Sequence, residues 1–308
     1  MEEALPPLPL SSRARLVRQT LARTRASRIL MGNPRLIRLA IATQLRLFPQ
    51  PTGIRVRREI INGVPVEIIQ PARSWPRRRM LYLHGGGYVF CSPMTHRGFA
   101  ARLALACDAS VWLPAYRLAP AHPYPAALED AQHVWEAFDA PGDGEGQREQ
   151  RLLGGDSAGG GLSLALCYRL REQGLRLPDK LYLLSPWLDL THSGDSHQSC
   201  AELDPMITTD WIEQDCARHY AGTASRQDPC ISPLFGDPGG MPPTFIQVGT
   251  HEILLDDSRR FAAQARAAGV DIRIEYGEGL WHVWPITAPF APEGAAAIQR
   301  AGEWLGAG

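Results

Sequence analysis

The chain has 308 residues, of which 44% are hydrophobic, and this is enough to bury one large core or two smaller ones. Lys plus Arg and Asp plus Glu both total 32, so the formal net charge is +0, and this balance excludes a general electrostatic attraction to nucleic acid or to anionic lipid. We expect one large α/β domain with an accessory layer, because no linker-like stretch divides the sequence.

The cysteines and the N-terminus both point to a reducing compartment. The six cysteines include no C-x-x-C pair and several lie in apolar helical stretches, so we expect buried free thiols. The first residues, MEEALPPLPL, lack the basic-then-apolar order of a secretory signal. No apolar run is long enough to span a membrane. The sequence therefore predicts a cytoplasmic protein without stable membrane insertion.

Residues 11–48 interleave arginines with aliphatic residues, which predicts two amphipathic helices with a break near Gly32-Asn33-Pro34. We expect these helices to pack over the body of the protein with their arginines facing water. The alternative is a basic amphipathic stretch that lies on a membrane, and it predicts binding to anionic vesicles that weakens with salt.

A sheet begins at residue 54, where apolar residues start to alternate with polar ones. Segments 54–60 and 64–70 flank Asn62-Gly63, a strong signal for a β-hairpin. Beyond residue 76 strand and helix patterns alternate, which indicates a largely parallel sheet. The predicted strands span 80–83, 110–113, 151–153, 181–184, 244–248 and 272–276, and the predicted helices lie near 95–107, 125–138, 158–172, 256–268 and 294–306.

One connection is too long for an ordinary crossover. Residues 186–243 are proline-rich and contain one predicted short helix at 210–220, and insertions of this size at strand ends are usually lids or binding layers. We therefore expect residues 186–243, together with the N-terminal helices of residues 1–50, to form a helical cap. Residues 51–185 and 244–308 would then form the main domain.

A serine lies in a sharp turn between the strand at 151–153 and the helix at 158–172. The pentapeptide Gly155-Asp156-Ser157-Ala158-Gly159 fits the G-x-S-x-G nucleophile elbow, in which a strained serine needs neighbours with little bulk. The start of the following helix favours negative charge near this serine. Taken alone, the pattern also fits a tight strand-to-helix connection without chemistry.

A second glycine-rich loop, His84-Gly85-Gly86-Gly87-Tyr88, follows the strand at 80–83. Consecutive glycines allow backbone N–H groups to turn toward a ligand, as an oxyanion hole requires. The loop lacks the Lys-Ser/Thr of a P-loop and the spacing of a dinucleotide fingerprint. Together, the two loops are a specific signal for a serine nucleophile next to an oxyanion hole.

These motifs resemble the hormone-sensitive-lipase-like carboxylesterases of the α/β-hydrolase superfamily, in their bacterial branch. The resemblance runs from about residue 50 to the end of the chain. It implies an α/β-hydrolase fold, with a mostly parallel central sheet flanked by helices and a helical cap over the catalytic domain. The matching stretches are HGGGY (84–88), YRLAPAHPYPAALED (116–130), GGDSAGGG (154–161), SPWLDLT (185–191), DPMIT (204–208), VGTHEILLDDS (248–258) and WHVW (281–284).

The family orders its triad as nucleophile, acid and histidine, which implies Ser157 as the nucleophile and His282 as the base. Relatives carry an aspartate in a pattern like D-x-L-x-D-E, and alignment with this pattern puts Glu252 at the acid position. Asp256 and Asp257 are the rivals, but both fall where a helix begins, and carboxylates there commonly serve the helix dipole. The alternative for Glu252 is a solvated loop carboxylate.

The resemblance also implies an oxyanion hole and a substrate pocket. The expected oxyanion donors are the N–H groups of Gly85, Gly86, Gly87 and Ala158. The residues expected to border a small hydrophobic acyl site are Tyr88, Trp187, Met206 and Trp211, although each fits ordinary core packing when taken singly. Neither a metal nor an organic cofactor is required, and His251-Glu252 lacks the H-E-x-x-H spacing of a zinc site.

The expected function is hydrolysis of small-molecule esters with short or medium acyl chains, because no long exposed apolar lid is present. A lactone hydrolase would use the same residues. A third reading, a relative that binds small molecules without turnover, is disfavoured because Ser157, His282 and a carboxylate are all present. A homodimer, paired through the edge strand near the C-terminus, is an expectation from the resemblance only.

Overall fold

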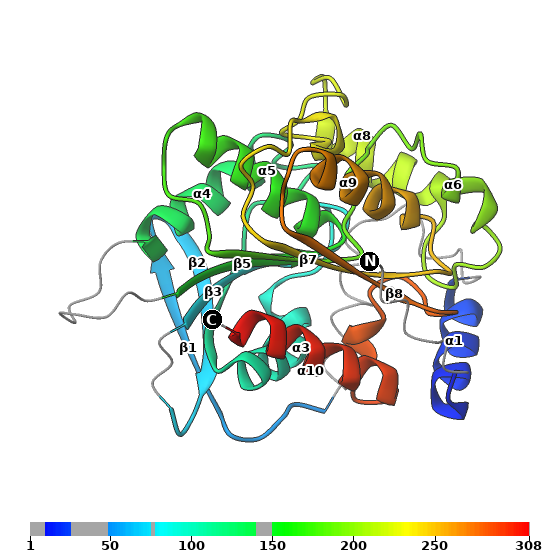
Figure 1. The fold of residues 1–308 in the computed structure, drawn as a ribbon, viewed down its shortest axis with the longest axis horizontal. Coiled ribbons are helices and arrows are strands. Elements are labelled where there is room, and N and C mark those ends of the chain that lie inside the picture. Colours follow the sequence, from blue (N-terminus) through cyan, green and yellow to red (C-terminus); the bar gives the residue numbers. More distant parts are fainter. Residues whose placement is uncertain (1–9, 26–48, 75–77, 140–149, 308) are drawn as a thin grey trace.

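The computed structural model describes residues 10–25, 49–74, 78–139 and 150–307. Its centre is an eight-stranded sheet in the order β1-β2-β4-β3-β5-β6-β7-β8, with helices on both faces (Figure 1). β1 and β2 pair antiparallel, β2 joins β4 antiparallel, and all later pairs are parallel. The strands are β1 Ile54–Ile61, β2 Val64–Pro71, β3 Arg78–Leu83, β4 Ala109–Pro114, β5 Gln150–Asp156, β6 Lys180–Leu184, β7 Thr244–Gly249 and β8 Ile272–Gly277.

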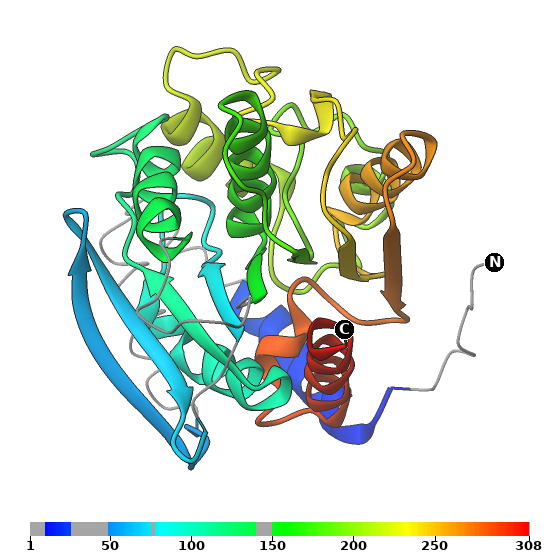
Figure 2. The ribbon, with the colours of Figure 1, turned by 60° about the vertical axis from the view of Figure 1, so that its left-hand side comes forward.

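Two helical layers cover this sheet, as Figures 1 and 2 show. Because the parallel strands are covered on both faces, their residues are apolar in nearly continuous runs. The predicted α/β class, the hairpin, the six later strands and the five long helices are thereby confirmed. One layer holds α3 Pro93–Cys107 and α10 Pro292–Gly306, and the other holds α4 Ala126–Asp139, α5 Ala158–Glu172 and α9 Leu255–Ala267.

The hairpin turn follows directly from its two residues. Ile61 pairs with Val64, so only Asn62 and Gly63 form the loop, and both have positive φ, 46° and 85°. A two-residue loop with two positive φ values matches the twist of antiparallel strands.

The first N-terminal helix, α1 Ser12–Arg25, packs on the body of the protein. Ala14 is fully buried, and Val17 and Leu21 pack on the cluster that includes α10, while Arg13 and Arg15 are exposed. This arrangement agrees with the expected packing of that helix, whereas the end of the first expected helix and all of the second, within residues 26–48, lie outside the described residues. None of the helices in the described ranges is long and apolar enough to span a bilayer.

Residues 186–243 connect β6 to β7 as expected. Figure 1 shows α6 (Ser196–Ser199) and α8 (Arg218–Ala221) on the same side of the sheet as α5 and α9. The predicted helix at 210–220 is present but interrupted: α7 Thr209–Trp211 passes into a π-helical stretch, Ile212–Ala217, before α8. Such π-helical stretches are rare and often occur at functional sites.

All six cysteines lie in the described ranges and are free thiols, as expected. Four are buried and two are half-buried. Burial raises the pKa of both Cys91 and Cys107 to about 12, which suppresses the thiolate form that a cysteine nucleophile needs.

Candidate active site

Ser157 occupies a strained turn between β5 and α5. Its φ is 52° and its ψ is −123°, a sparsely populated conformation that persists only when neighbouring groups hold it. Two hydrogen bonds do so, because the Ser157 N–H donates to the Leu184 carbonyl (2.9 Å) and the Trp187 N–H donates to the Ser157 carbonyl (2.9 Å). The turn is therefore braced by the end of β6 and the segment that follows it.

Gly159 explains how the two glycine loops meet. A Cβ at this position would lie 2.0 Å from the Leu83 carbonyl oxygen and 2.5 Å from that of His84. These are backbone atoms at the end of β3, and they cannot yield as a flexible side chain can. Only glycine allows the first turn of α5 to reach the point where the HGGG loop begins.

The loop after β8 places His282 against Ser157. The His282 Nε2 atom lies 2.9 Å from Ser157 Oγ, and its Nδ1 atom lies 3.4 Å from Glu252 Oε1. A carboxylate oxygen only accepts, so Nδ1 carries the proton and donates to it. In neutral His282, the Nε2 lone pair therefore faces the hydroxyl of Ser157. The structure brings the three residues together from segments far apart in the sequence.

The histidine and the glutamate are withdrawn from solvent, with exposed fractions of 4% and 0%. Burial opposes the protonation of His282, but the hydrogen bond and charge of Glu252, followed by the charge of Asp204, outweigh it. The pKa of His282 is therefore raised above its ordinary value. The two neighbouring carboxyl groups therefore favour the protonated form of His282.

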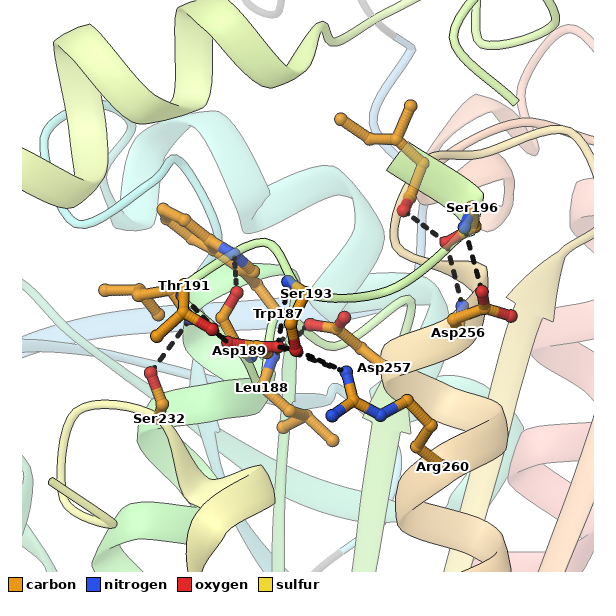
Figure 3. A network of polar contacts seen from close by, with 12 residues as sticks. Trp187, Leu188, Asp189, Thr191, Ser193, Ser196, Ser232, Asp256, Asp257 and Arg260 are labelled. Carbon is orange, nitrogen blue, oxygen red and sulfur yellow. Dashed lines mark hydrogen bonds and ion pairs between the residues drawn. The ribbon is translucent and has the colours of Figure 1, made fainter. Parts of the chain in front are cut away.

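The two rival carboxylates serve the loop of residues 187–196 instead, as Figure 3 shows. Asp256 Oδ2 accepts from the Ser196 N–H (2.8 Å). Asp257 Oδ2 accepts from the N–H groups of Leu188 (2.7 Å) and Asp189 (3.0 Å), and burial holds the pKa of Asp257 well above its usual range. Of the three carboxylates weighed from the sequence, Glu252 is the one in contact with His282.

One of the four expected oxyanion donors is otherwise engaged. The Gly85 N–H donates to Asp156 Oδ1 (3.1 Å), so its expected role must be corrected. Within the described residues, no protein group accepts from the N–H of Gly86, Gly87 or Ala158. Gly86 has φ of +114°, and a Cβ there would lie 2.6 Å from the Phe90 carbonyl oxygen, so this loop shape requires glycine.

Asp156 and His84 fix the glycine loop beside the serine. Buried Asp156 also accepts from Tyr82 Oη (3.0 Å) and contacts His96 Nε2 (3.3 Å). His84 stacks on Tyr116 with ring centroids 4.3 Å apart, and Tyr116 Oη donates to the His84 carbonyl (2.6 Å). Burial lowers the pKa of His84 to about 3, so this histidine is a neutral structural group.

Known proteins share both the fold and the sequence of this chain. Residues 80–286 match a family described as having the α/β hydrolase fold. The chain belongs to the α/β-hydrolase family. An acetyl-hydrolase from Streptomyces hygroscopicus is 39% identical over 80% of this chain and 80% of its own. An esterase from Acinetobacter venetianus is 33% identical over 88% of each chain.

Solved structures narrow the likeness of this α/β-hydrolase to one group of esterases. An esterase from the bacterial hormone-sensitive lipase family superimposes with a TM-score of 0.90 at 38% identity, over 97% of this chain and 99% of the other. The structure of EstE5 soaked with p-nitrophenyl butyrate superimposes with a TM-score of 0.89 at 34% identity, over 96% of this chain and 98% of the other. The resemblance to bacterial hormone-sensitive-lipase-like enzymes is confirmed.

The α/β-hydrolase site contains two groups to which the motifs assigned no role. Ser185 Oγ donates to Glu252 Oε2 (2.8 Å) and accepts from the Val283 N–H (3.1 Å). Buried Asp204 accepts from the N–H groups of Met206 (2.8 Å), Ile207 (3.1 Å) and Ile253 (3.1 Å), and burial raises the pKa of Asp204 to about 6. Both lie in matching stretches, SPWLDLT and DPMIT, but only the tertiary contacts single them out.

The four expected pocket residues fall into two groups in this α/β-hydrolase. Tyr88 and Trp187 are each only 1% exposed, and Tyr88 stacks on Tyr220 with ring centroids 3.6 Å apart. Met206 and Trp211 are half-buried, and Trp211 stacks on Phe90, just after the glycine loop, at 5.5 Å. The first pair packs as core, and the second is partly exposed to solvent.

Proposed function

We propose that this protein is a serine carboxylesterase that hydrolyses esters with short or medium acyl chains through an acyl-enzyme on Ser157. The observation that carries the proposal is the contact of His282 Nε2 with Ser157 Oγ at 2.9 Å, with Glu252 behind the ring. A hydroxyl, a neutral imidazole and a buried carboxylate in this order are the parts needed for nucleophilic acyl transfer. The esterase and acetyl-hydrolase names of the relatives support the same reaction class.

In the first half-reaction, Ser157 Oγ attacks the ester carbonyl carbon while His282 Nε2 takes the hydroxyl proton. The negative charge that develops on the carbonyl oxygen is stabilised by the N–H groups of Gly86, Gly87 and Ala158, aided by the positive end of α5. Glu252 stabilises the protonated His282. The imidazolium then donates its proton to the departing alcohol, which leaves the acyl group on Ser157.

In the second half-reaction, His282 removes a proton from water, and the resulting hydroxide equivalent attacks the acyl-enzyme carbonyl. The same N–H groups hold the second oxyanion. Its collapse breaks the bond to Ser157 Oγ, which regains its proton from His282. The products are one carboxylic acid and one alcohol, and no step requires a metal or an organic cofactor.

The preference for short or medium acyl chains is supported by the aromatic groups beyond the glycine loop. Tyr88 is the last residue of that loop and Phe90 lies two residues later, and their rings stack on those of Tyr220 and Trp211. Such bulk next to the oxyanion donors favours a shallow acyl site. The name of one relative, acetyl-hydrolase, is consistent with a site for a small acyl group.

Hydrolysis of 4-nitrophenyl esters from acetate to laurate tests this proposal. We expect kcat/KM to be highest for acetate to hexanoate and to fall by at least about 10-fold toward laurate, because a chain too long for a small pocket displaces the ester carbonyl from Ser157 and the oxyanion donors. Comparable rates for acetate and laurate would refute the chain-length preference. Inactivity on the whole series would refute the esterase function itself. A lactone panel run in parallel decides between open-chain and cyclic esters.

The pH dependence of kcat/KM should follow His282, which must be neutral to accept the proton of Ser157. Because its pKa is raised, the protonated form persists to higher pH than in an ordinary histidine, whose pKa is about 6.5. Activity should therefore be lost on acidification with a midpoint above pH ~6.5. Measurement of kcat/KM between about pH 5 and about pH 9 checks this, and a midpoint at or below about pH 6 contradicts it.

We further propose that residues 1–50 and 186–243 form a cap over the catalytic domain of residues 51–185 and 244–308. Residues of the inserted segment contact the site, since the Trp187 N–H donates to the Ser157 carbonyl.

A homodimer is also proposed, because β8 is an edge strand of the sheet and an open strand edge can pair with a second copy.

A further inference from the structure

We propose that the Ser185 hydroxyl is a positioning group for the acid and the base, holding the Glu252 carboxylate so that Oε1 faces His282. The inference rests on the proposed triad and adds a fourth side chain to it. Ser185 does not touch the reacting atoms, so it would act through Glu252 and through the backbone next to His282.

The first support is the double role of one hydroxyl. Ser185 Oγ donates to Glu252 Oε2 at 2.8 Å and accepts from the Val283 N–H at 3.1 Å. Val283 is the residue that follows His282. The hydroxyl therefore bridges the loop that carries the acid and the loop that carries the base. Ser185 is fully buried, so no solvent competes for either hydrogen bond.

The second support is the length of the acid. Glutamate has one more rotatable bond than aspartate, and its carboxylate must be held against rotation to face an imidazole. Glu252 Oε2 accepts from Ser185 Oγ and from the Gly249 N–H (2.9 Å). With Oε2 held by these two donors, Oε1 is the atom left for His282 Nδ1. Two fixed hydrogen bonds thereby determine which oxygen serves the base.

The third support is backbone strain at the residue that carries this hydroxyl and at the residue whose N–H donates to it. Ser185 has φ of 44° and Val283 has φ of 49°, and a β-branched residue in this left-handed region is a true outlier. Strained residues persist where the surroundings over-determine them. The Ser185 N–H donates to the Gln247 carbonyl (2.7 Å) and the Val283 N–H donates to Ser185 Oγ (3.1 Å), so hydrogen bonds hold both residues in place.

The fourth support is the set of hydrogen bonds that the short segment beginning at Ser185 forms. Two residues later, the Trp187 N–H donates to the Ser157 carbonyl (2.9 Å). Residues 185–187 thus contact the nucleophile, the acid and the chain next to the base. A change at Ser185 is transmitted to the geometry of all three.

The test is Ser185→Ala, studied alone and combined with Glu252→Gln. We expect Ser185→Ala to lower kcat by about 10- to 100-fold while KM changes less than about 3-fold, as for other groups that orient a directly acting residue. The acidic midpoint of kcat/KM should move to lower pH, because a loosened Glu252 raises the pKa of His282 less. In the Glu252→Gln background, Ser185→Ala should lower kcat by a smaller factor than in the wild-type background, since only the contact with the backbone next to His282 is then left to lose.

A second variant and a matched control separate positioning from folding. Ser185→Gly also removes the hydroxyl but relaxes the positive φ, so it remains folded if the alanine variant does not, and the same kinetics are expected. The control is Ser232→Ala. Ser232, which is labelled in Figure 3, is fully buried, and its Oγ accepts from the Leu190 N–H (2.9 Å). Its kcat and pH midpoint should stay at the wild-type values.

The failure of this inference is distinguishable from the failure of the proposed function. Wild-type kcat and an unmoved pH midpoint in both Ser185 variants would overturn the positioning role, provided that Ser157→Ala is inactive. An equal loss from Ser185→Ala in the wild-type and Glu252→Gln backgrounds would overturn it as well. Retained turnover in Ser157→Ala would instead overturn the proposed function.

Discussion

Replacement of Ser157 by alanine is expected to lower kcat by at least about 10,000-fold, because no acyl-enzyme can form without the hydroxyl. The substitution should leave the fold intact. The turn at Ser157 is braced by backbone hydrogen bonds to Leu184 and Trp187, and the oxyanion donors are backbone groups that remain in place. The residual rate would come from these donors and from substrate binding alone.

The measurement is turnover of 4-nitrophenyl acetate by the wild type and the variant, with folding checked by circular dichroism. Ser163→Ala is the matched control, because Ser163 lies on the same helix, is fully buried and donates to the Gly159 carbonyl (2.7 Å). Its activity should stay within about 3-fold of the wild type. If Ser157→Ala keeps more than about 1% of the activity, the nucleophile lies elsewhere.

Replacement of Glu252 by glutamine is expected to lower kcat by about 1,000- to 10,000-fold through the tautomer of His282. Ser185 Oγ and the Gly249 N–H both donate to Oε2, so the amide oxygen of glutamine must occupy that position. Its NH₂ group then faces His282 Nδ1 and requires a lone pair there. The ring proton moves to Nε2, where it blocks acceptance of the Ser157 proton.

The control for the acid is Asp257→Asn. Burial disfavours the charged form of Asp257 and keeps the pKa of its carboxyl well above its usual range, and the same burial favours the neutral amide that replaces it. Its Oδ2 partners, the N–H groups of Leu188 and Asp189, can be retained by the amide oxygen. Activity within about 3-fold of the wild type is expected. Inactivation by Asp257→Asn combined with an active Glu252→Gln would show that the acid was assigned wrongly.

Much of the fold could be predicted because its signals are local. Strands buried on both faces appear as apolar runs, and the alternation with helices indicates a parallel sheet. Ser157 was found for the same reason, since G-x-S-x-G describes a turn that only small neighbours allow. The interruption of the predicted helix at 210–220 by a π-helical stretch was missed, because one extra residue in a turn leaves no mark in the apolar pattern.

The acid shows the limit of local signals. Glu252, Asp256 and Asp257 lie within six residues of one another in the sequence, and alignment with the family pattern favoured Glu252 while Asp256 and Asp257 remained as rivals. Three-dimensional packing separates them, because the start of α9 directs Asp256 and Asp257 to the loop of residues 187–196. Gly85 was misassigned for a similar reason, since the partner of its N–H, Asp156, lies 71 residues away.

The sequence by itself determined the α/β class, the strand order along the chain and the two glycine loops, because each depends on residues close together in the chain. Only the tertiary structure decided which N–H groups remain open, which carboxylate contacts His282, and that Ser185 joins the acid to the base. Those properties arise where the ends of parallel strands converge. Hydrogen bonds there link residues 30 to 125 positions apart, and directional contacts of this kind are set by packing that no local pattern encodes.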